Sequence, residues 1–223
     1  MQKFYTIQQA SYRNGSRSNK PNQDRKSVWF KYPLINPSEN SQHVSELPYG
    51  FVGVYDGHGV DYGHFIAQIA KDFFDKAIPE YWEALNLTPN KVIEKLFSLA
   101  NKKIKEELIS LLESKNYEVE VESILVDEKK YPYIKYRKHA SGKWIPCRGG
   151  TTCSLVIILE NSIIYHAHVG DSECVAFNPI VKTGKHELEN LTKNHSPNSI
   201  EEYKRVTKNF KDKAGRFLYD IYG

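Results

Sequence analysis

The chain has 223 residues, of which 40% are hydrophobic and 26% are charged. This length and composition are typical of one globular domain, so we expect residues 1–223 to form a single domain. The net charge of +4 results from 31 basic and 27 acidic residues, a small excess that does not indicate nucleic acid binding. No apolar run approaches the ~18 residues of a membrane span. We therefore expect neither nucleic acid nor a membrane as a partner.

The cysteine content and the first residues of the chain bear on the compartment. Cys147, Cys153 and Cys174 form no CxxC pair, and an odd number fits a disulfide framework poorly. A reducing compartment is the simpler interpretation. The first residues lack a secretory apolar core, and Gln2 replaces the glycine that N-myristoylation requires. These features predict an intracellular protein, cytoplasmic or nuclear.

The first half of the chain alternates strand-forming and polar stretches and then becomes helical. YGFVGVYDGHG is an apolar run that ends at glycines, which predicts a buried strand leading into a tight turn. Thr88-Pro89 combines a capping residue with a proline at the first helical position. The predicted elements are strands at 1–12 and 27–32, loops at 13–24 and 33–48, a buried strand within 49–59, and helices over 61–78 and from Thr88 through Leu111.

Residues 114–148 interrupt this pattern. YEVEVESILV alternates like a strand, and a charged, aromatic stretch with proline and glycine follows it. We interpret the segment as a hairpin-like insertion or a mobile loop. Three predicted strands then follow (TTCSLVIILE, SIIYHAHV and ECVAFN), with a polar loop and a helix over 198–208. Strands, paired helices and further strands predict an α+β domain with antiparallel sheets flanked by helices.

Four short motifs place polar or glycine residues where predicted strands end or begin, which is where a rigid scaffold presents functional side chains. Each motif also has a purely structural interpretation: a capped turn, a hairpin turn, a bulge at a loop entry, or a β-turn. The motifs are Asn22-Gln23-Asp24, Asp56-Gly57-His58-Gly59, the run from Arg148 to Thr152, and Val169-Gly170-Asp171-Ser172.

Taken together, the motifs suggest a metal site. Asp24, Asp56 and Asp171, with the carbonyl of Gly57, form an all-oxygen set that suits Mg²⁺ or Mn²⁺ rather than zinc. Two such ions lower the pKa of a bridging water and stabilise a phosphoryl group under attack. His58 could protonate the leaving oxygen.

The order of these motifs resembles the protein phosphatase 2C family of metal-dependent phosphatases, also called PPM phosphatases. The matching stretches are NQD, FVGVYDGHG, GGTTCSLVII, AHVGDSECVAF and LTKNHSPNSIEEYKRV. The resemblance implies a sandwich of two antiparallel sheets flanked by helices. It also implies hydrolysis of phosphoserine and phosphothreonine in phosphoprotein substrates, with two Mg²⁺ or Mn²⁺ ions.

The resemblance also implies roles for individual residues. Asp56 would bridge the two ions and Gly57 would ligate through its carbonyl. His58 would be the general acid, Asp24 would lie near the ions, and Asp171 would match the carboxylate of an additional, weaker metal site. A basic residue before NQD would contact the substrate phosphate, and Arg17 and Lys20 are the candidates.

The sequence also departs from the family pattern. Gln23 stands where many members have glutamate, and Glu173 stands where arginine is common. The later SDG and DN motifs, which give metal-ligating aspartates in the family, have no match, so we expect a domain that is incomplete at its C-terminus. This leaves three hypotheses. The first is a phosphatase of which this chain is a fragment or whose remaining part is a separate polypeptide. The others are a weak or inactive phosphatase-like binding protein, and a structural α+β protein whose motifs are coincidental turns.

Overall fold

The computed structural model describes residues 22–31, 48–126, 129–138, 142–180, 185–196 and 199–210. The helices are α1 (Gly63–Glu80), α2 (Trp82–Leu87), α3 (Pro89–Ser114) and α4 (Ile200–Phe210). The strands are β1 (Arg25–Lys31), β2 (Tyr49–Tyr55), β3 (Gly57–His58), β4 (Tyr117–Val126), β5 (Lys129–Lys138), β6 (Ile145–Pro146), β7 (Gly150–Thr151), β8 (Cys153–Ile158), β9 (Ile164–Val169), β10 (Val175–Ile180) and β11 (Lys185–Asn190). None of the helices in these ranges has the length and apolar character needed to cross a membrane.

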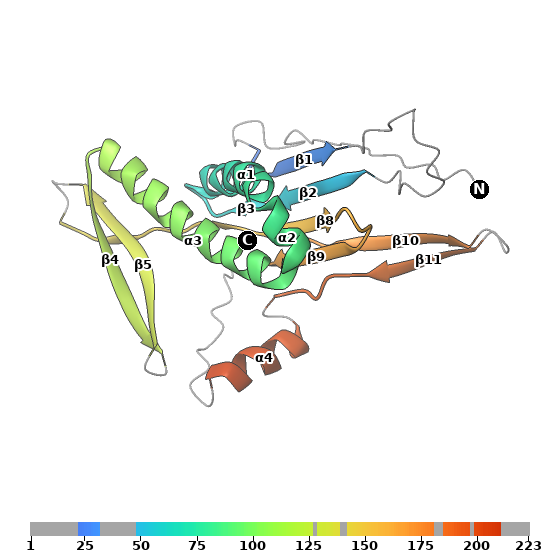
Figure 1. The fold of residues 1–223 in the computed structure, drawn as a ribbon. Helices are drawn as coiled ribbons and strands as arrows, with labels where there is room; N and C mark the ends of the chain where they lie inside the picture. Colours follow the sequence, from blue (N-terminus) through green and yellow to red (C-terminus); the bar gives the residue numbers. More distant parts are fainter. Residues whose placement is uncertain are drawn as a thin grey trace.

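The central sheet is antiparallel, with the strand order β1-β2-β8-β9. Alternate side chains of a strand point to opposite faces, and on β2 the buried residues Phe51 and Tyr55 both face the helices. Leu155 and Ile157 of β8 join the same core, together with apolar side chains of α1, α2 and α3. Helices α1, α2 and α3 therefore cover one face of this sheet, and β1 and β2 lie close to α1 (Figure 1).

Aromatic rings fill the space between α1 and the sheet. Phe74 is 1% exposed, and its ring lies 6.0 Å from that of Tyr55 and 5.3 Å from that of Phe97. Cys153 is also buried in this core, and burial raises the pKa of its thiol far above the ordinary range. The thiol is therefore a neutral, apolar part of the packing.

The helices match the sequence patterns with small shifts. The helix predicted over 61–78 is α1, and the start predicted at Thr88-Pro89 is the start of α3. The Thr88 hydroxyl makes no capping bond to α3 and instead lies 3.4 Å from the carbonyl of Ala84, to which it donates. The short helix α2 was not predicted. The strand predicted at 1–12 lies outside the described residues.

The described part of 114–148 forms an antiparallel hairpin, β4–β5, with β6 added beside β5. One end of it packs on α3 through a second apolar cluster that includes Leu112, Ile134 and Tyr136. Its outer face carries ion pairs between the strands, in which Lys135 lies 3.0 Å from both Glu120 and Glu122. The hairpin thus has its own anchoring cluster, and it lies beside α3 in Figure 1.

After β9 the chain forms the two-stranded β10–β11 ribbon and then α4. Strand β11 falls in a stretch for which no strand was predicted, whereas α4 matches the helix predicted over 198–208 with a shift of two residues. The α+β class, with antiparallel sheets flanked by helices, is confirmed.

The aromatic core gives a direct test of the packing. Replacing Phe74 with alanine removes a fully buried ring and leaves a cavity, so we expect a loss of about 3–5 kcal/mol in the free energy of unfolding by urea. Leu87→Ala is the control, because Leu87 is 81% exposed and its truncation should cost less than about 0.5 kcal/mol. Equal losses in the two variants would contradict this description of the core.

Candidate functional site

The Asp56–Gly59 turn begins where β2 ends, at the edge of the buried sheet. Gly57 and His58 form the two-residue strand β3, which pairs antiparallel with Gly150 and Thr151 of β7. This pairing joins two of the predicted motifs, which are more than ninety residues apart in the sequence. Asp56 and His58 are both exposed, whereas Gly57 is buried. The turn therefore presents a carboxylate and an imidazole to solvent from a fixed backbone.

Glycines make the close contact between these two strands possible. A Cβ atom on Gly150 would lie 2.6 Å from the Cε1 and Nε2 atoms of His58. A Cβ atom on Gly59, whose φ is +98°, would lie 2.6 Å from the Cα of Gly149. Real Cβ atoms are not found at such distances from neighbouring atoms. The glycine pair after Arg148 thus provides the space in which the His58 ring is held, and close packing is the role that the structure gives it.

Thr152 connects three of the four motifs. Its hydroxyl accepts a hydrogen bond from the backbone N–H of Asp56 at 3.0 Å, and its own N–H donates to the Asp56 carbonyl at 2.8 Å. The same hydroxyl lies 2.6 Å from the hydroxyl of Ser172, which follows Asp171. Thr152 is 5% exposed, so these bonds are shielded from water. One buried side chain therefore sets the separation between the Asp56 turn and the Asp171 turn.

Gln23 connects the remaining motif to the Asp56 turn. Its backbone carbonyl accepts from the N–H of Gly57 at 3.3 Å. Its side-chain amide, in the orientation that satisfies both groups, donates to the carbonyls of Gly57 and Gly59 at 3.2 and 3.1 Å. A glutamate carboxylate cannot donate these bonds, which gives a physical reason for glutamine at this position. Arg25 supports the same loop by donating to the carbonyls of Asn22 and Asp24 at 2.9 and 2.8 Å.

The acidic side chains of the site repel one another. Partial burial raises the pKa of the Asp56 carboxyl, the nearby charge and hydrogen bond of Asp24 raise it further, and the charge of Asp171 adds to the effect. The positive charge that His58 can carry acts in the opposite direction. Asp24 thus affects the Asp56 carboxyl more strongly than Asp171 does.

A divalent cation would relieve this repulsion, and the oxygen donors fit a hard ion such as Mg²⁺ or Mn²⁺. In the described ranges, however, no three histidine, cysteine, aspartate or glutamate side chains are grouped closely enough to hold a metal ion. These two observations agree, because charge repulsion acts over longer distances than metal coordination does. Of the two neighbouring carboxylates, Asp24 has the stronger effect on Asp56 and Asp171 the weaker.

Two of the predicted site residues are not among those that the structure describes. Arg17 and Lys20 fall outside the described residues. Sequence reasoning missed the roles of Thr152 and of the Gln23 side chain, although both residues lie inside motifs that it identified. The only signal available was the position of each polar residue directly beside a glycine-rich or acidic turn.

Three histidine rings stack beside the Asp171 turn. His166 and His168 of β9 have ring centroids 5.1 Å apart, and the ring of His195 lies 4.6 Å from that of His168. The Nδ1 atom of His195 accepts a hydrogen bond from the N–H of Gly170 at 3.4 Å. Burial and the charge of His168 lower the pKa values of both His166 and His195. The stack therefore connects the segment before α4 to the Asp171 turn, and its environment favours the neutral forms of His166 and His195.

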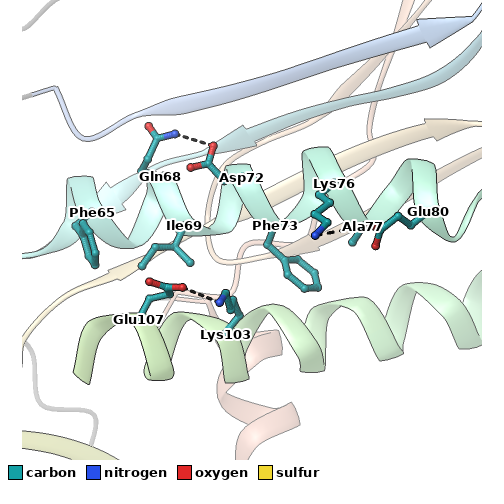
Figure 2. Close-up of a pocket in the computed structure, with 10 residues that line it drawn as sticks. All are labelled: Phe65, Gln68, Ile69, Asp72, Phe73, Lys76, Ala77, Glu80, Lys103 and Glu107. Carbon is teal, nitrogen blue, oxygen red and sulfur yellow. Dashed lines mark hydrogen bonds and ion pairs between the residues drawn. The ribbon is translucent and has the colours of Figure 1, made fainter. Parts of the chain in front are cut away.

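Another pocket lies on the helical side of the molecule and is not lined by these residues. It is a groove of about 530 Å³ between α1 and α3, in which Phe65, Ile69 and Phe73 of α1 lie toward α3 (Figure 2). Its cations face carboxylates of their own helices, with Lys103 2.6 Å from Glu107. None of the candidate site residues lines it. The groove is therefore separate from the acidic site.

The hydroxyl of Thr152 can be tested by an isosteric change. Thr152→Val leaves the N–H of Asp56 without its buried acceptor, so we expect a loss of about 1–3 kcal/mol in the free energy of unfolding by urea. Thr151→Val is the matched control, since among the described residues its hydroxyl bonds only to the adjacent carbonyl of Thr152, and we expect a loss of at most about 1 kcal/mol. A Thr152→Val variant as stable as wild type would show that the hydroxyl does not hold the two turns together.

The histidine stack predicts a loss of stability in acid. The pKa values of His166 and His195 lie below the ordinary value in the folded protein. Below about pH 6.5 the unfolded chain therefore binds more protons at these residues than the folded protein does. Stability contributed by the neutral rings is therefore present above that pH and is lost as the pH falls through the folded pKa values. Glu202, whose pKa Arg205 lowers, acts in the same direction, whereas Asp56 opposes it.

Urea unfolding between about pH 7.5 and about pH 5.5 measures this dependence. His195→Gln should flatten the decrease, because it removes one of the rings that resist protonation. His64→Gln, in α1 and outside the stack, should keep the wild-type pH dependence. Parallel curves for wild type and His195→Gln would exclude the stack as the cause.

Comparison with known proteins places this arrangement in a family. The family model described as protein phosphatase 2C matches residues 22–212. Two curated relatives, the integrin-linked kinase-associated serine/threonine phosphatase 2C of Mus musculus and that of Homo sapiens, are each 31% identical to the chain over 88 residues. The match covers 40% of this chain and only 22% of each relative. Because the family model covers most of its length and all of the motifs described above, the chain belongs to the protein phosphatase 2C family.

Proposed function

We propose that this chain is a metal-dependent phosphatase that hydrolyses phosphoserine and phosphothreonine in protein substrates. The observation that supports this most is the pairing of Asp24 with Asp56 beside His58, held by contacts among motifs from distant parts of the sequence. An anionic pair that raises the pKa of one of its members favours a bound cation. Family membership supports the reaction class.

The ligands of the proposed metal site would be Asp56, Asp24 and the carbonyl of Gly57, with Asp171 at an additional, weaker site. Mg²⁺ or Mn²⁺ bound there would supply an activated water and charge stabilisation for the phosphoryl group. Gly57 is buried, and a Cβ at this position would lie 2.4 Å from the carbonyl oxygen of Gly63. Only glycine therefore fits, and the tight packing fixes the backbone from which Asp56 and the Gly57 carbonyl are presented.

His58 would act as the general acid. Its exposed ring lies against Gly150 and two residues from Asp56 along the chain, so it can reach a phosphate ester held at the carboxylates and protonate the leaving oxygen. Arg17 and Lys20, which lie outside the described residues, remain the proposed contacts for the substrate phosphate. A second polypeptide that supplies further aspartates is the partner that would complete such a site.

A second candidate function is that of a phosphatase-like binding protein with weak or no activity. The arrangement of the described acidic residues favours it, since these residues place two carboxylates together and not three. Two carboxylates and one carbonyl leave much of the coordination of two ions to water. Such a protein would still engage phosphoproteins at this surface. The two candidates differ in turnover and in metal affinity.

Hydrolysis of a phosphothreonine peptide by the 223-residue chain distinguishes them. We expect turnover that requires Mn²⁺, that falls below detection in Asp56→Asn, and that falls by about 10²–10⁴-fold in His58→Gln. Asp72→Asn is the matched control, because Asp72 lies on α1 and its side chain is 62% exposed. It should keep wild-type activity.

Calorimetric titration with Mn²⁺ gives a readout that does not depend on turnover. Metal binding that Asp56→Asn abolishes, without hydrolysis, would support the binding protein. If Asp56→Asn kept both metal binding and activity, both candidates would be contradicted. The motifs would then have a structural role.

A further inference from the structure

A smaller pocket lies beside the proposed catalytic residues. It has a volume of about 280 Å³ and is formed by α3, β5 and the segment that leads into β7. We call it the hairpin pocket, and its lining residues are Ile66, Asn101, Ile104, Lys105, Leu108, Pro132, Tyr133, Ile134, Cys147, Gly149, Gly150 and Thr151. The hairpin β4–β5 thus contributes one wall of a pocket whose other walls belong to α1, to α3 and to residues 147–151.

The hairpin pocket and His58 lie on two paired strands. Gly150 and Thr151 line the pocket, and in the ladder they pair with His58 and Gly57. The backbone of the Asp56 turn therefore lies one strand spacing, about 4.8 Å, from the pocket lining. An extended peptide advances about 3.3 Å per residue. A residue two to four positions from a phosphorylated residue held at Asp56 and His58 would reach the pocket.

The chemistry of the lining indicates what would bind. Most of the lining side chains are apolar, and Lys105 is the only charged residue among them. No acidic residue lines the pocket. Within the described part of the chain, no acidic residue forms an ion pair with Lys105. The groove of Figure 2 is different, because its lysines face carboxylates of their own helices.

We propose that the hairpin pocket is a specificity subsite for the phosphoprotein substrate. It receives an apolar side chain close to the phosphorylated residue, and Lys105 pairs with a neighbouring carboxylate of the same peptide. The proposal rests on the proposed function for the position of the phosphorylated residue. It adds the substrate class, which is phosphopeptides flanked by apolar and acidic residues. The hairpin of residues 117–138 then acts as a substrate-recognition element.

The test uses two fluorescent phosphothreonine peptides that differ only in the flanking charge, one with Glu-Leu and one with Lys-Leu. Fluorescence anisotropy gives their dissociation constants for the 223-residue chain. We expect wild type to bind the acidic peptide more tightly than the basic one. Lys105→Glu should weaken binding of the acidic peptide by about 5–20-fold and strengthen binding of the basic peptide. Lys105→Gln should remove the preference without reversing it. Replacing the peptide leucine with glycine should weaken binding to wild type.

Lys91→Glu is the matched control for net charge. Lys91 is exposed on the same helix, about 21 Å from Lys105 at 1.5 Å per residue. Equal effects of Lys91→Glu and Lys105→Glu, or equal weakening of both peptides by Lys105→Glu, would overturn the proposal.

The proposed function can fail separately. If the preference for the acidic peptide depended on Lys105 but no Mn²⁺-dependent hydrolysis occurred, the subsite would be supported and the proposed phosphatase activity would be rejected. Hydrolysis of both peptides and of p-nitrophenyl phosphate with no effect of Lys105→Glu on KM would retain the enzyme and reject the subsite.

Discussion

The contact between the Asp56–Gly59 turn and the Gly149–Gly150 pair is the constraint on which the site depends. At this contact two backbones and the His58 ring approach more closely than any side chain with a Cβ allows. Thr152 then fixes the two strands in register, because its buried hydroxyl accepts from the N–H of Asp56 and its backbone N–H donates to the Asp56 carbonyl. The position of the carboxylate thus follows from packing and hydrogen bonding in the neutral backbone. No attraction between the charged groups is needed to assemble it.

This constraint also explains why repulsion persists in the folded protein. Partial burial of Asp56 and its repulsion from Asp24 raise the free energy of the fold when both carboxyls are ionised, as the raised pKa of Asp56 indicates. The loop of residues 22–24 is nevertheless held in place by Gln23 and Arg25, which bind backbone carbonyls. The surrounding hydrogen bonds therefore maintain an acidic pair that would otherwise separate. Such stored repulsion is typical of sites that bind cations or act on charged groups.

Much of the fold was predictable because its signals are local. The apolar spacing of α1 and α3 and the β-branched run of β2 each lie within one stretch of sequence. The Asp56 turn was identified for the same reason, since an aspartate and glycines follow an apolar strand directly. The contributions of Thr152 and Gln23 were not predictable, because each depends on a partner brought close by tertiary packing. Strand β11 was missed because KHELEN has the polarity of a loop and forms a strand by pairing with β10.

The burial of Cys153 has a practical consequence for following motions of this site. The residue comes directly after Thr152, and its thiol lies in the core with a strongly raised pKa. It can react with an alkylating reagent only when β8 separates from the helices, whereas Cys147 and Cys174 are half-buried. The rate of labelling at Cys153 therefore reports how often the strand behind the Asp56 turn opens. Cys153 is thus a native probe of the rigidity of the scaffold that carries the site.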